Sequence, residues 1–250
     1  MKNFKWQNLI LPIATILCLI AIWSAVSLIT NSEYILPSFF KTLSVAFSLL
    51  GQGKFYLAFL MTLVRTIIAF VLSFSLAFAL AFLSIKSKTA EKIISPLISI
   101  IRALPTIAVV LLLLFWTNSF IAPIIVTMLV VLPTSFNSVK DALSGVDEQI
   151  LQALRLFNVD KKKIFYKVQL PQITPPMLSA IGAGISLNLK LMVAAEVLSA
   201  TVRSIGSLLN SASYNGEIST MIALVLITVV VGVAIESTFN MLAKRAGKWK

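Results

Sequence analysis

Long apolar runs separated by short polar segments dominate the sequence. Six of these runs reach the length of about 20 residues that a helix needs to cross a hydrocarbon core of roughly 30 Å. They lack the alternation of apolar and polar positions that is typical of membrane β-strands. The first run is about twice as long as the core of a signal peptide, so we expect a retained helix there. The pattern predicts an all-α, multi-pass membrane protein, a single domain over residues 1–250, with spans at about 9–30, 56–85, 93–117, 120–139, 177–200 and 219–243.

The positively charged residues indicate how these spans are oriented. The chain has 21 Lys and Arg residues against nine Asp and Glu residues, which gives a net charge of +12. With the N-terminus in the cytoplasm, 15 of the 21 lie in cytoplasmic segments, three in outer segments and three within spans. Positive residues accumulate on the cytoplasmic side of membrane proteins, so we expect both termini in the cytoplasm. The same distribution explains the net charge without a nucleic-acid partner.

The composition excludes several kinds of chemistry. The chain is 58% hydrophobic and 12% charged, with no His and a single Cys, Cys18. Without imidazole or a second thiol it offers no His-based metal site, Ser-His-Asp triad or internal disulfide. It also lacks the G-x-x-x-x-G-K-[ST] loop that binds nucleotide phosphates. We therefore expect a chain that is not an enzyme, that has no catalytic residue, metal or bound cofactor, and that does not itself hydrolyse ATP.

The cytoplasmic segment 140–176, between the fourth and fifth spans, has a helical pattern of its own. Its apolar residues recur at helical spacing from 147 to 157: Ile150, Leu151, Ala153, Leu154 and Phe157. A second short amphipathic helix is predicted over 161–170, ending at Pro171. Asn158 lies between the two helices, where a turn usually needs one residue at positive φ and Asn commonly takes the place of Gly. The segment therefore predicts a helical hairpin on the cytoplasmic side.

This hairpin carries a spaced set of residues that resembles a known signature. The set consists of Gln152, Ala153, Leu154, Asn158, Val168, Leu170 and Pro171. It is similar to the motif E-A-A-x3-G-x9-I-x-L-P of binding-protein-dependent ABC importer permeases, with every spacing kept. Gln replaces Glu, Leu replaces the second Ala, Asn replaces Gly and Val replaces Ile. Residues Leu36–Ser38, Leu63–Arg65, Arg102 with Pro105, and Ala195 with Glu196 resemble the nitrate/sulfonate/taurine branch, so that the resemblance covers about 35–245.

The resemblance implies an architecture and a set of partners. Such permeases have the type I importer fold with six transmembrane helices and lie in the bacterial inner or plasma membrane. They dimerise, here as an expected homodimer, above cytoplasmic ABC ATPase subunits that use ATP and Mg. An extracytoplasmic solute-binding protein or lipoprotein delivers the solute. The resemblance also implies that the hairpin is the coupling helix, which contacts the ATPase through Gln152, Ala153, Leu154, Asn158, Leu170 and Pro171.

The branch suggests a small organic anion, such as a sulfonate, taurine or a nitrate-like solute, as the substrate. Two alternatives remain open. One is an ABC permease for a vitamin precursor or another small nutrient. The other is a stand-alone secondary transporter, in which charges within the membrane carry ion coupling and the hairpin needs no partner.

Ionisable residues within the predicted spans are the candidates for the translocation path. Such residues usually face a cavity, pair with another charge or snorkel to the surface, because charge in hydrocarbon is costly. We predict that Arg102, Lys190 and Glu196 belong to the path and that the two cations favour an anionic solute. In the structural alternative, Arg102 snorkels and Lys190 neutralises Glu196 or Glu236. The roles of Arg65 and Glu236 stay open.

Three further features of the sequence carry expectations about the fold. The stretch 38–50 lies at the outer surface or starts the next helix, and 201–218 forms a re-entrant or surface loop. Small residues in the fifth span indicate a helix interface or a dimer contact: Ala180, Gly182, Ala183, Gly184 and Ser186. Prolines in the third and fourth spans suggest kinked helices: Pro96, Pro105, Pro123 and Pro133.

Overall fold

The computed structural model describes residues 7–146 and 148–247, which form helices joined by short turns. Within these ranges there is no β-strand. The elements in chain order are α1 (Gln7–Thr30), α2 (Phe39–Leu50), α3 (Gly53–Lys86), α4 (Lys88–Ala103), α5 (Thr106–Trp116), α6 (Ala122–Ser144), α7 (Glu148–Leu156), α8 (Lys161–Ile164), the π-helical turn η1 (Phe165–Gln169), α9 (Leu170–Leu198), α10 (Ile205–Tyr214) and α11 (Ile218–Ala246).

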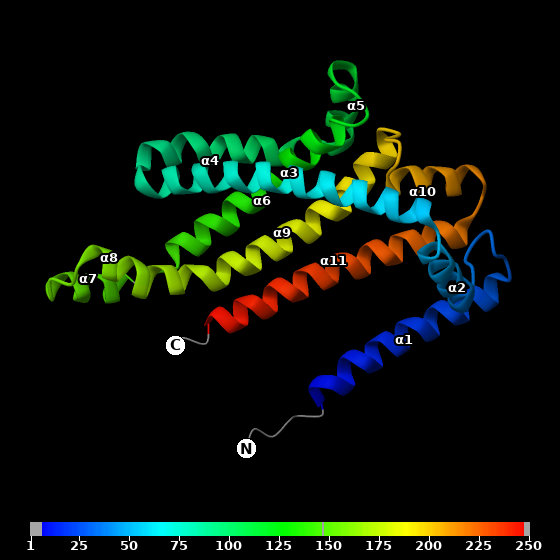
Figure 1. The fold of residues 1–250 in the computed structure, drawn as a ribbon, viewed down its shortest axis with the longest axis horizontal. Helices are drawn as coiled ribbons and strands as arrows, with labels where there is room; N and C mark the ends of the chain where they lie inside the picture. The colour runs from blue at the N-terminus through cyan, green and yellow to red at the C-terminus, as the bar shows by residue number, and fades with distance from the viewer. Residues whose placement is uncertain (1–6, 147, 248–250) are drawn as a thin grey trace.

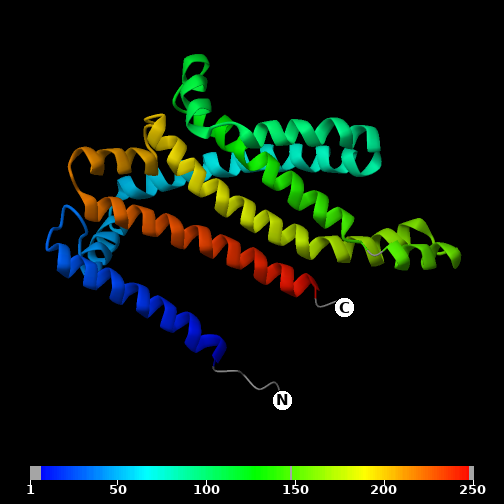
Figure 2. The same cartoon turned by 180° about the vertical axis from the view of Figure 1, so that it is seen from behind.

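Four long helices, α3, α6, α9 and α11, form the body of the molecule (Figures 1 and 2). Among the described residues, five helical stretches are long and apolar enough to cross a membrane, and the number rises to six if the bent pair α4 and α5 counts as one span. This confirms the predicted all-α fold with up to six spans. The orientation of the termini stays a prediction.

The third predicted span, 93–117, is wrong as a single helix. It consists of α4 and α5, whose axes differ by 91°. The chain breaks at Leu104, which has an extended ψ of 129° because the ring of Pro105 disfavours helical backbone in the residue before it. Figure 1 shows α4 beside α3 while α5 turns away from the bundle. The other prolines do not end helices: Pro96 and Pro133 lie inside α4 and α6, and Pro123 lies in the first turn of α6.

Two apolar cores hold the bundle together, one towards each end. The first joins α2, α3, α9, α10 and α11 through Leu49, Phe55, Val193, Ile205, Leu209, Ala223 and Leu224. The second joins α3, α4 and α6 through Ala77, Ala81, Ile94, Ile98, Leu132, Phe136 and Val139. In this second core α3 contributes small residues, Ala77 and Ala81, and small residues let helices approach closely in lipid.

The small residues of the fifth span form helix interfaces within the chain. A Cβ atom on Gly182 would lie 2.5 Å from the Cβ atom of Phe239 in α11. A Cβ atom on Gly184 would lie 2.6 Å from a ring carbon of Phe70 in α3. The predicted helix interface is therefore confirmed, and these two glycines are occupied by contacts inside one protomer.

Helix α1 stands apart from the bundle in both views (Figures 1 and 2). It is held through the segment that follows it: the indole N–H of Trp23 donates to the carbonyl of Pro37 at 2.9 Å, and the Ser27 hydroxyl donates to that of Leu36 at 3.0 Å. The stretch after Pro37 forms the separate helix α2, whose first turn is capped by the side chain of Ser38. It does not continue into the next span, since α2 ends at Leu50 and α3 begins at Gly53.

Candidate functional site

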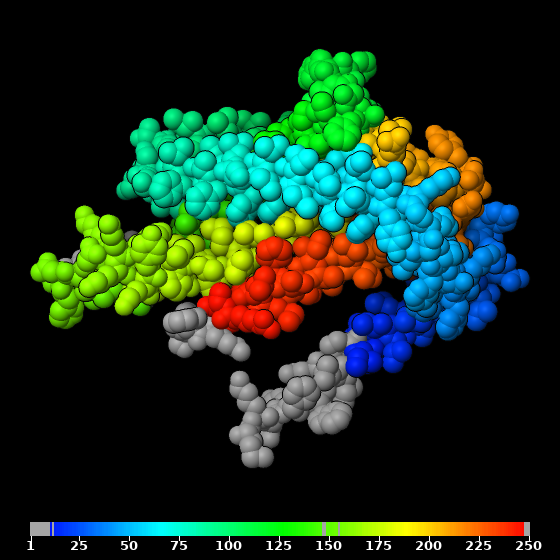
Figure 3. Space-filling model, in the orientation of Figure 1, coloured from blue at the N-terminus to red at the C-terminus, as the bar shows by residue number. Residues whose placement is uncertain are grey.

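The hairpin formed by α7, α8 and η1 projects from the bundle at the end where α9 begins, and is seen in yellow-green at the left of Figures 1 and 3. One buried side chain from each arm, Leu151 and Ile164, gives the hairpin an interior. At its turn, Leu156 and Phe157 are 83% and 82% exposed, and Tyr166 in η1 is also exposed. Exposed apolar side chains that extend beyond the bundle are typical of a surface that contacts another protein.

The turn of the hairpin has the backbone conformation that the sequence predicts. Asn158 has a φ of 53°, which confirms the predicted positive φ. The N–H of Val159 donates to the carbonyl of Leu154 at 3.1 Å, the long-range bond of a Schellman motif. Gln152, Ala153 and Asn158 are exposed, and Leu154 is half-buried. Four of the seven residues that match the family signature therefore lie on α7 and on the turn that ends it, and the other three lie in η1 and at the start of α9.

The second arm differs from the prediction, because the helix does not end at Pro171. The stretch Lys161–Leu198 is continuous over 38 residues through α8, η1 and α9. Pro171 lacks an N–H group and lies in the first turn of α9, immediately after the wider π turn of η1, where helical bonding is already shifted. Leu170 is exposed and Pro171 is half-buried. The hairpin is thus joined to a transmembrane helix without a flexible break.

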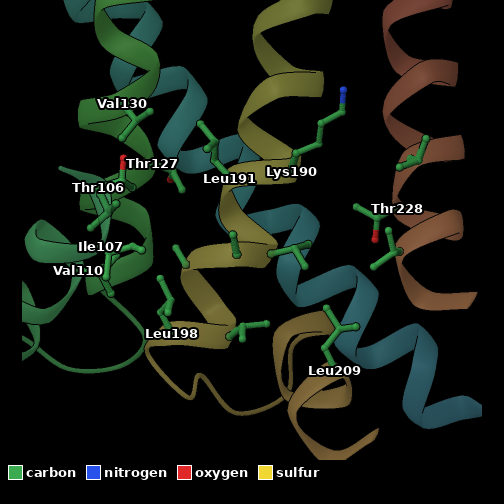
Figure 4. A pocket seen from close by; sticks show the side chains of 17 residues that line it. Thr106, Ile107, Val110, Thr127, Val130, Lys190, Leu191, Leu198, Leu209 and Thr228 are labelled. Atoms are coloured by element: carbon green, nitrogen blue, oxygen red, sulfur yellow. The ribbon is translucent and has the colours of Figure 1, made fainter. Parts of the chain in front are cut away.

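A cavity of about 530 Å³ lies between α5, α6, α9, α10 and α11 (Figure 4). Its walls are aliphatic except for three Thr residues, Thr106, Thr127 and Thr228, and one Lys, Lys190. Leu198 and Leu209 line the end of the cavity next to the turn that follows α9. The ammonium group of Lys190 points away from that end, along α9 toward its N-terminus (Figure 4). A single positive charge therefore borders an otherwise apolar space.

The three predicted path residues do not lie together. Lys190 lines the cavity, whereas Arg102 is exposed in the last turn of α4 and is absent from the cavity wall. Glu196 is fully buried and is also absent from it. The structural alternative in which Lys190 neutralises Glu196 is wrong, since Glu196 pairs with Arg65. Within the described ranges Glu236 forms no ion pair.

The partner of Glu196 is a residue whose role the sequence left open. Nη1 of Arg65 in α3 lies 2.6 Å from Oε1 of Glu196 in α9, and both side chains are buried. The hydroxyl of Thr62, one turn before Arg65, donates to Oε2 of Glu196 at 2.8 Å. We call these three residues the Arg65–Glu196 cluster. The rule that a charge in the membrane needs a partner applies to both ionisable residues, but no sequence signal identified Thr62.

Arg65 also contacts the connections at this end of the bundle. Its Nη2 donates to the carbonyl of Val202 at 3.4 Å, in the turn between α9 and α10. Its guanidinium group lies over the ring of Phe120, 4.8 Å from the ring centroid, in the turn between α5 and α6. The segment 201–218, predicted as a re-entrant or surface loop, connects α9 to α11 and contains the short helix α10, which the sequence did not predict. Ser204 and Ser207 form a capping box at its start.

The arrangement is that of a type I ABC importer permease, and solved structures agree. A chain of the MetNI methionine ABC transporter in inward-facing conformations superposes with a TM-score of 0.63 at 16% identity, over 74% of this chain and 93% of that one. A chain of an amino acid ABC transporter crystallised with histidines gives a TM-score of 0.63 at 19% identity, over 75% and 92%. At this level of identity the likeness concerns the fold.

The sequence assigns the family. Residues 69–248 match the family described as binding-protein-dependent transport system inner membrane component, and this chain belongs to that family. The glycine betaine transport system permease protein OpuAB of Bacillus subtilis (strain 168) is 22% identical over 116 residues, which are 46% of this chain and 41% of that protein. The chain thus covers less than half of the length of this relative. None of these relatives supports the predicted nitrate/sulfonate/taurine branch.

Proposed function

We propose that this chain forms the solute path of an ABC importer and couples that path to ATP hydrolysis by a separate cytoplasmic ATPase. The observation that carries the proposal is the exposed hairpin. It projects from the bundle, presents Leu156 and Phe157 to solvent, and holds four of the seven signature residues on α7 and its turn. An amphipathic helix with a free apolar side binds in the groove of a partner. In this proposal the partner is the ATPase, contacted through the hairpin.

The other parts of the assembly follow from the family. The importer would contain two permease subunits, here two copies of this chain, in a bacterial inner or plasma membrane. ATPase subunits, using ATP and Mg, bind below them, and a solute-binding protein or lipoprotein binds on the outer face. The hairpin faces the cytoplasm, which is the side that the positive residues indicate.

The solute we propose is a small molecule that carries an anionic group. Lys190 is the one charged residue of a cavity that is otherwise lined by aliphatic side chains and three Thr residues. A sulfonate or taurine has such a group, and so do the solutes named for relatives of this chain, glycine betaine, methionine and amino acids. Arg102, two residues before the break at Leu104, would act on the solute only in a conformation that brings it to the path.

Disruption of the hairpin surface tests the coupling. We expect Phe157→Asp to lower the amount of ATPase that copurifies with the chain at least about tenfold, because a charge would replace a contact in an apolar groove. The matched control is Tyr214→Asp, which changes an aromatic residue that is 92% exposed in α10. The control should keep the normal amount of copurifying ATPase.

Two results would contradict this function. One is equal recovery of the ATPase with both variants, which would remove the hairpin from the interface. The other is solute uptake by vesicles that hold the purified chain alone, driven by an ion gradient without ATP. That second result would favour the stand-alone secondary transporter.

A further inference from the structure

The turn 199–204 and α10 lie at the end of the cavity opposite the hairpin (Figure 4). Leu198 is the last residue of α9, Leu209 lies in α10, and both line the cavity. Ile205 and Leu209 also belong to the apolar core at this end. A widening of the cavity at this end would therefore move the turn and α10 away from α9.

The start of α10 is bonded to two other helices by the Arg65–Glu196 cluster. The first four N–H groups of a helix have no partner within the helix. Here the N–H of Ile205 donates to the hydroxyl of Thr62 at 2.9 Å, and the N–H of Gly206 donates to Oε2 of Glu196 at 3.3 Å. The next two N–H groups bond to the side chain and carbonyl of Ser204. A carboxylate is also favoured at a helix N-terminus by the helix dipole.

The contact between α10 and α9 leaves no space for a side chain. A Cβ atom on Gly206 would lie 2.5 Å from the Cβ atom of Glu196 and 2.6 Å from the backbone N of Val197. The backbone of α10 therefore lies directly on the last turn of α9. Separation of the two would expose the Glu196 carboxylate and leave two N–H groups without acceptors.

The turn itself has a conformation that its residues do not favour. Ala200 and Arg203 both have a φ of 50°, in the left-handed region that costs residues with a Cβ atom free energy. Thr201 ties the turn to the connection between α5 and α6 by donating to the carbonyl of Ser119 at 2.6 Å. Backbone conformations of this kind persist where surrounding contacts hold them and are common at sites that switch.

Glu196 lies on the same continuous helical stretch as the second arm of the hairpin, so a movement of the hairpin would be transmitted to it. It lies near the far end of the continuous stretch Lys161–Leu198, which spans about 55 Å if helical throughout. Arg65 and Thr62 lie on α3, which is a separate long helix. A shift of α9 against α3, started at the hairpin, would therefore pull Glu196 away from both partners.

We propose that Arg65 and Glu196 are positioning residues that hold the turn 199–204 and α10 over the outer end of the solute path, and that their separation opens this end. The proposal rests on the proposed function, because it needs a solute path and a hairpin that moves. In this proposal Glu196 helps to keep the outer end of the path closed, and its side chain does not line the path. Arg65, Glu196 and Thr62 have no contact with solute in this mechanism.

The rate at which a thiol reagent labels a single cysteine in α10 measures whether the outer end of the path is closed. The experiment uses the complete importer in membranes, with Cys18→Ser and Leu209→Cys, and a membrane-impermeant thiol reagent added from the outside without nucleotide. We expect Glu196→Gln to speed the labelling of residue 209 about tenfold, because loss of a charge-assisted hydrogen bond shifts an equilibrium by about that factor. The matched control, Glu236→Gln, makes the same change on α11 and should leave the labelling rate unchanged.

A second variant covers the case in which Glu196→Gln does not assemble. Thr62→Val keeps the shape of the side chain but removes the acceptor for Ile205 and the donor to Glu196, and we expect about threefold faster labelling. Basal ATP hydrolysis without solute should rise in both variants as uptake falls. A merely structural role would lower the amount of assembled importer and would leave the labelling rate of the assembled fraction unchanged.

The proposal is overturned if assembled Glu196→Gln and Thr62→Val label at the rate of Glu236→Gln. The labelling rate is measured on this chain and tests whether the cluster keeps the path closed. The recovery of the ATPase is a separate measurement, and it tests the role of the hairpin. Failure of Phe157→Asp to release the ATPase would contradict the proposed function. Unchanged labelling in an importer that still couples would contradict only the closure.

Discussion

Residues other than glycine adopt positive φ in the turn after α7 and in the turn after α9. Asn158 ends α7, and Ala200 follows the end of α9. The N–H of Thr201 donates to the carbonyl of Glu196 at 3.0 Å, and that of Ala200 to Val197 at 3.3 Å, which together form a complete Schellman motif. Asn tolerates this conformation through its short polar side chain, whereas Ala has no such compensation. Ala200 is therefore a position where the chain is less stable than it could be.

Replacement of this alanine should stabilise the protein. We expect Ala200→Gly to raise the free energy of unfolding by about 1 kcal/mol, because glycine adopts positive φ without a Cβ clash. Ala183→Gly, in the middle of α9, should lower it by up to about 1 kcal/mol, since the same change there only adds backbone freedom. The midpoints of thermal unfolding in one detergent would show the opposite signs. Two shifts of the same sign would mean that the turn is not strained.

How far a residue can be predicted depends on how far away its partners lie in the sequence. The positive φ of Asn158 follows from two neighbouring helical patterns and a local residue preference, so the sequence predicted it. The partner of Glu196 lies 131 residues away in α3, and spacing within one helix carries no information about it. The sequence therefore indicated that Glu196 needs a partner and wrongly allowed Lys190 as one. Only the packing of α3 against α9 identifies Arg65.

The long helices were easier to predict from the sequence than the break at Leu104 or the short helix α10. The apolar runs marked all the long helices, because lipid imposes one length and one composition on every span. The break at Leu104 was harder, since a proline can kink a helix, lie in its first turn or end it, and the surrounding helices decide which occurs. Helix α10 was missed because its Ser, Asn and Gly residues resemble a loop. The capping box at Ser204 and the apolar core at this end make it a helix.

The contact between α9 and α11 offers a test of packing between elements. We expect Gly182→Ala to lower the free energy of unfolding by about 1–3 kcal/mol, because its Cβ atom would lie 2.5 Å from that of Phe239 and the helices would have to separate. Gly53→Ala is the matched control, since a Cβ atom there meets nothing within 4 Å. Thermal unfolding of the two variants measures the difference. Equal midpoints would show that α9 and α11 are not closely packed at this point.

At the scale of the whole molecule, charge and shape point to the same orientation. Positive residues concentrate in the predicted cytoplasmic segments, and the hairpin, with Lys161, Lys162, Lys163 and Lys167, projects at one end. Helices α2 and α10 lie at the other end (Figure 1), and the Arg65–Glu196 cluster is bonded to the start of α10 there, where few positive residues occur. Because Lys and Arg favour the cytoplasmic side, the hairpin end should be cytoplasmic and the cluster should lie toward the outside.

Single cysteines at the two ends test this orientation. In a Cys18→Ser background, Tyr214→Cys and Leu156→Cys replace side chains that are 92% and 83% exposed, so both thiols can react if the reagent reaches them. A membrane-impermeant thiol reagent added to intact cells should label residue 214, whereas residue 156 should react only after the membrane is permeabilised. The reverse pattern would place the hairpin outside the cell, where no ATP is available. That result would contradict both the coupling role of the hairpin and the position assigned to the Arg65–Glu196 cluster.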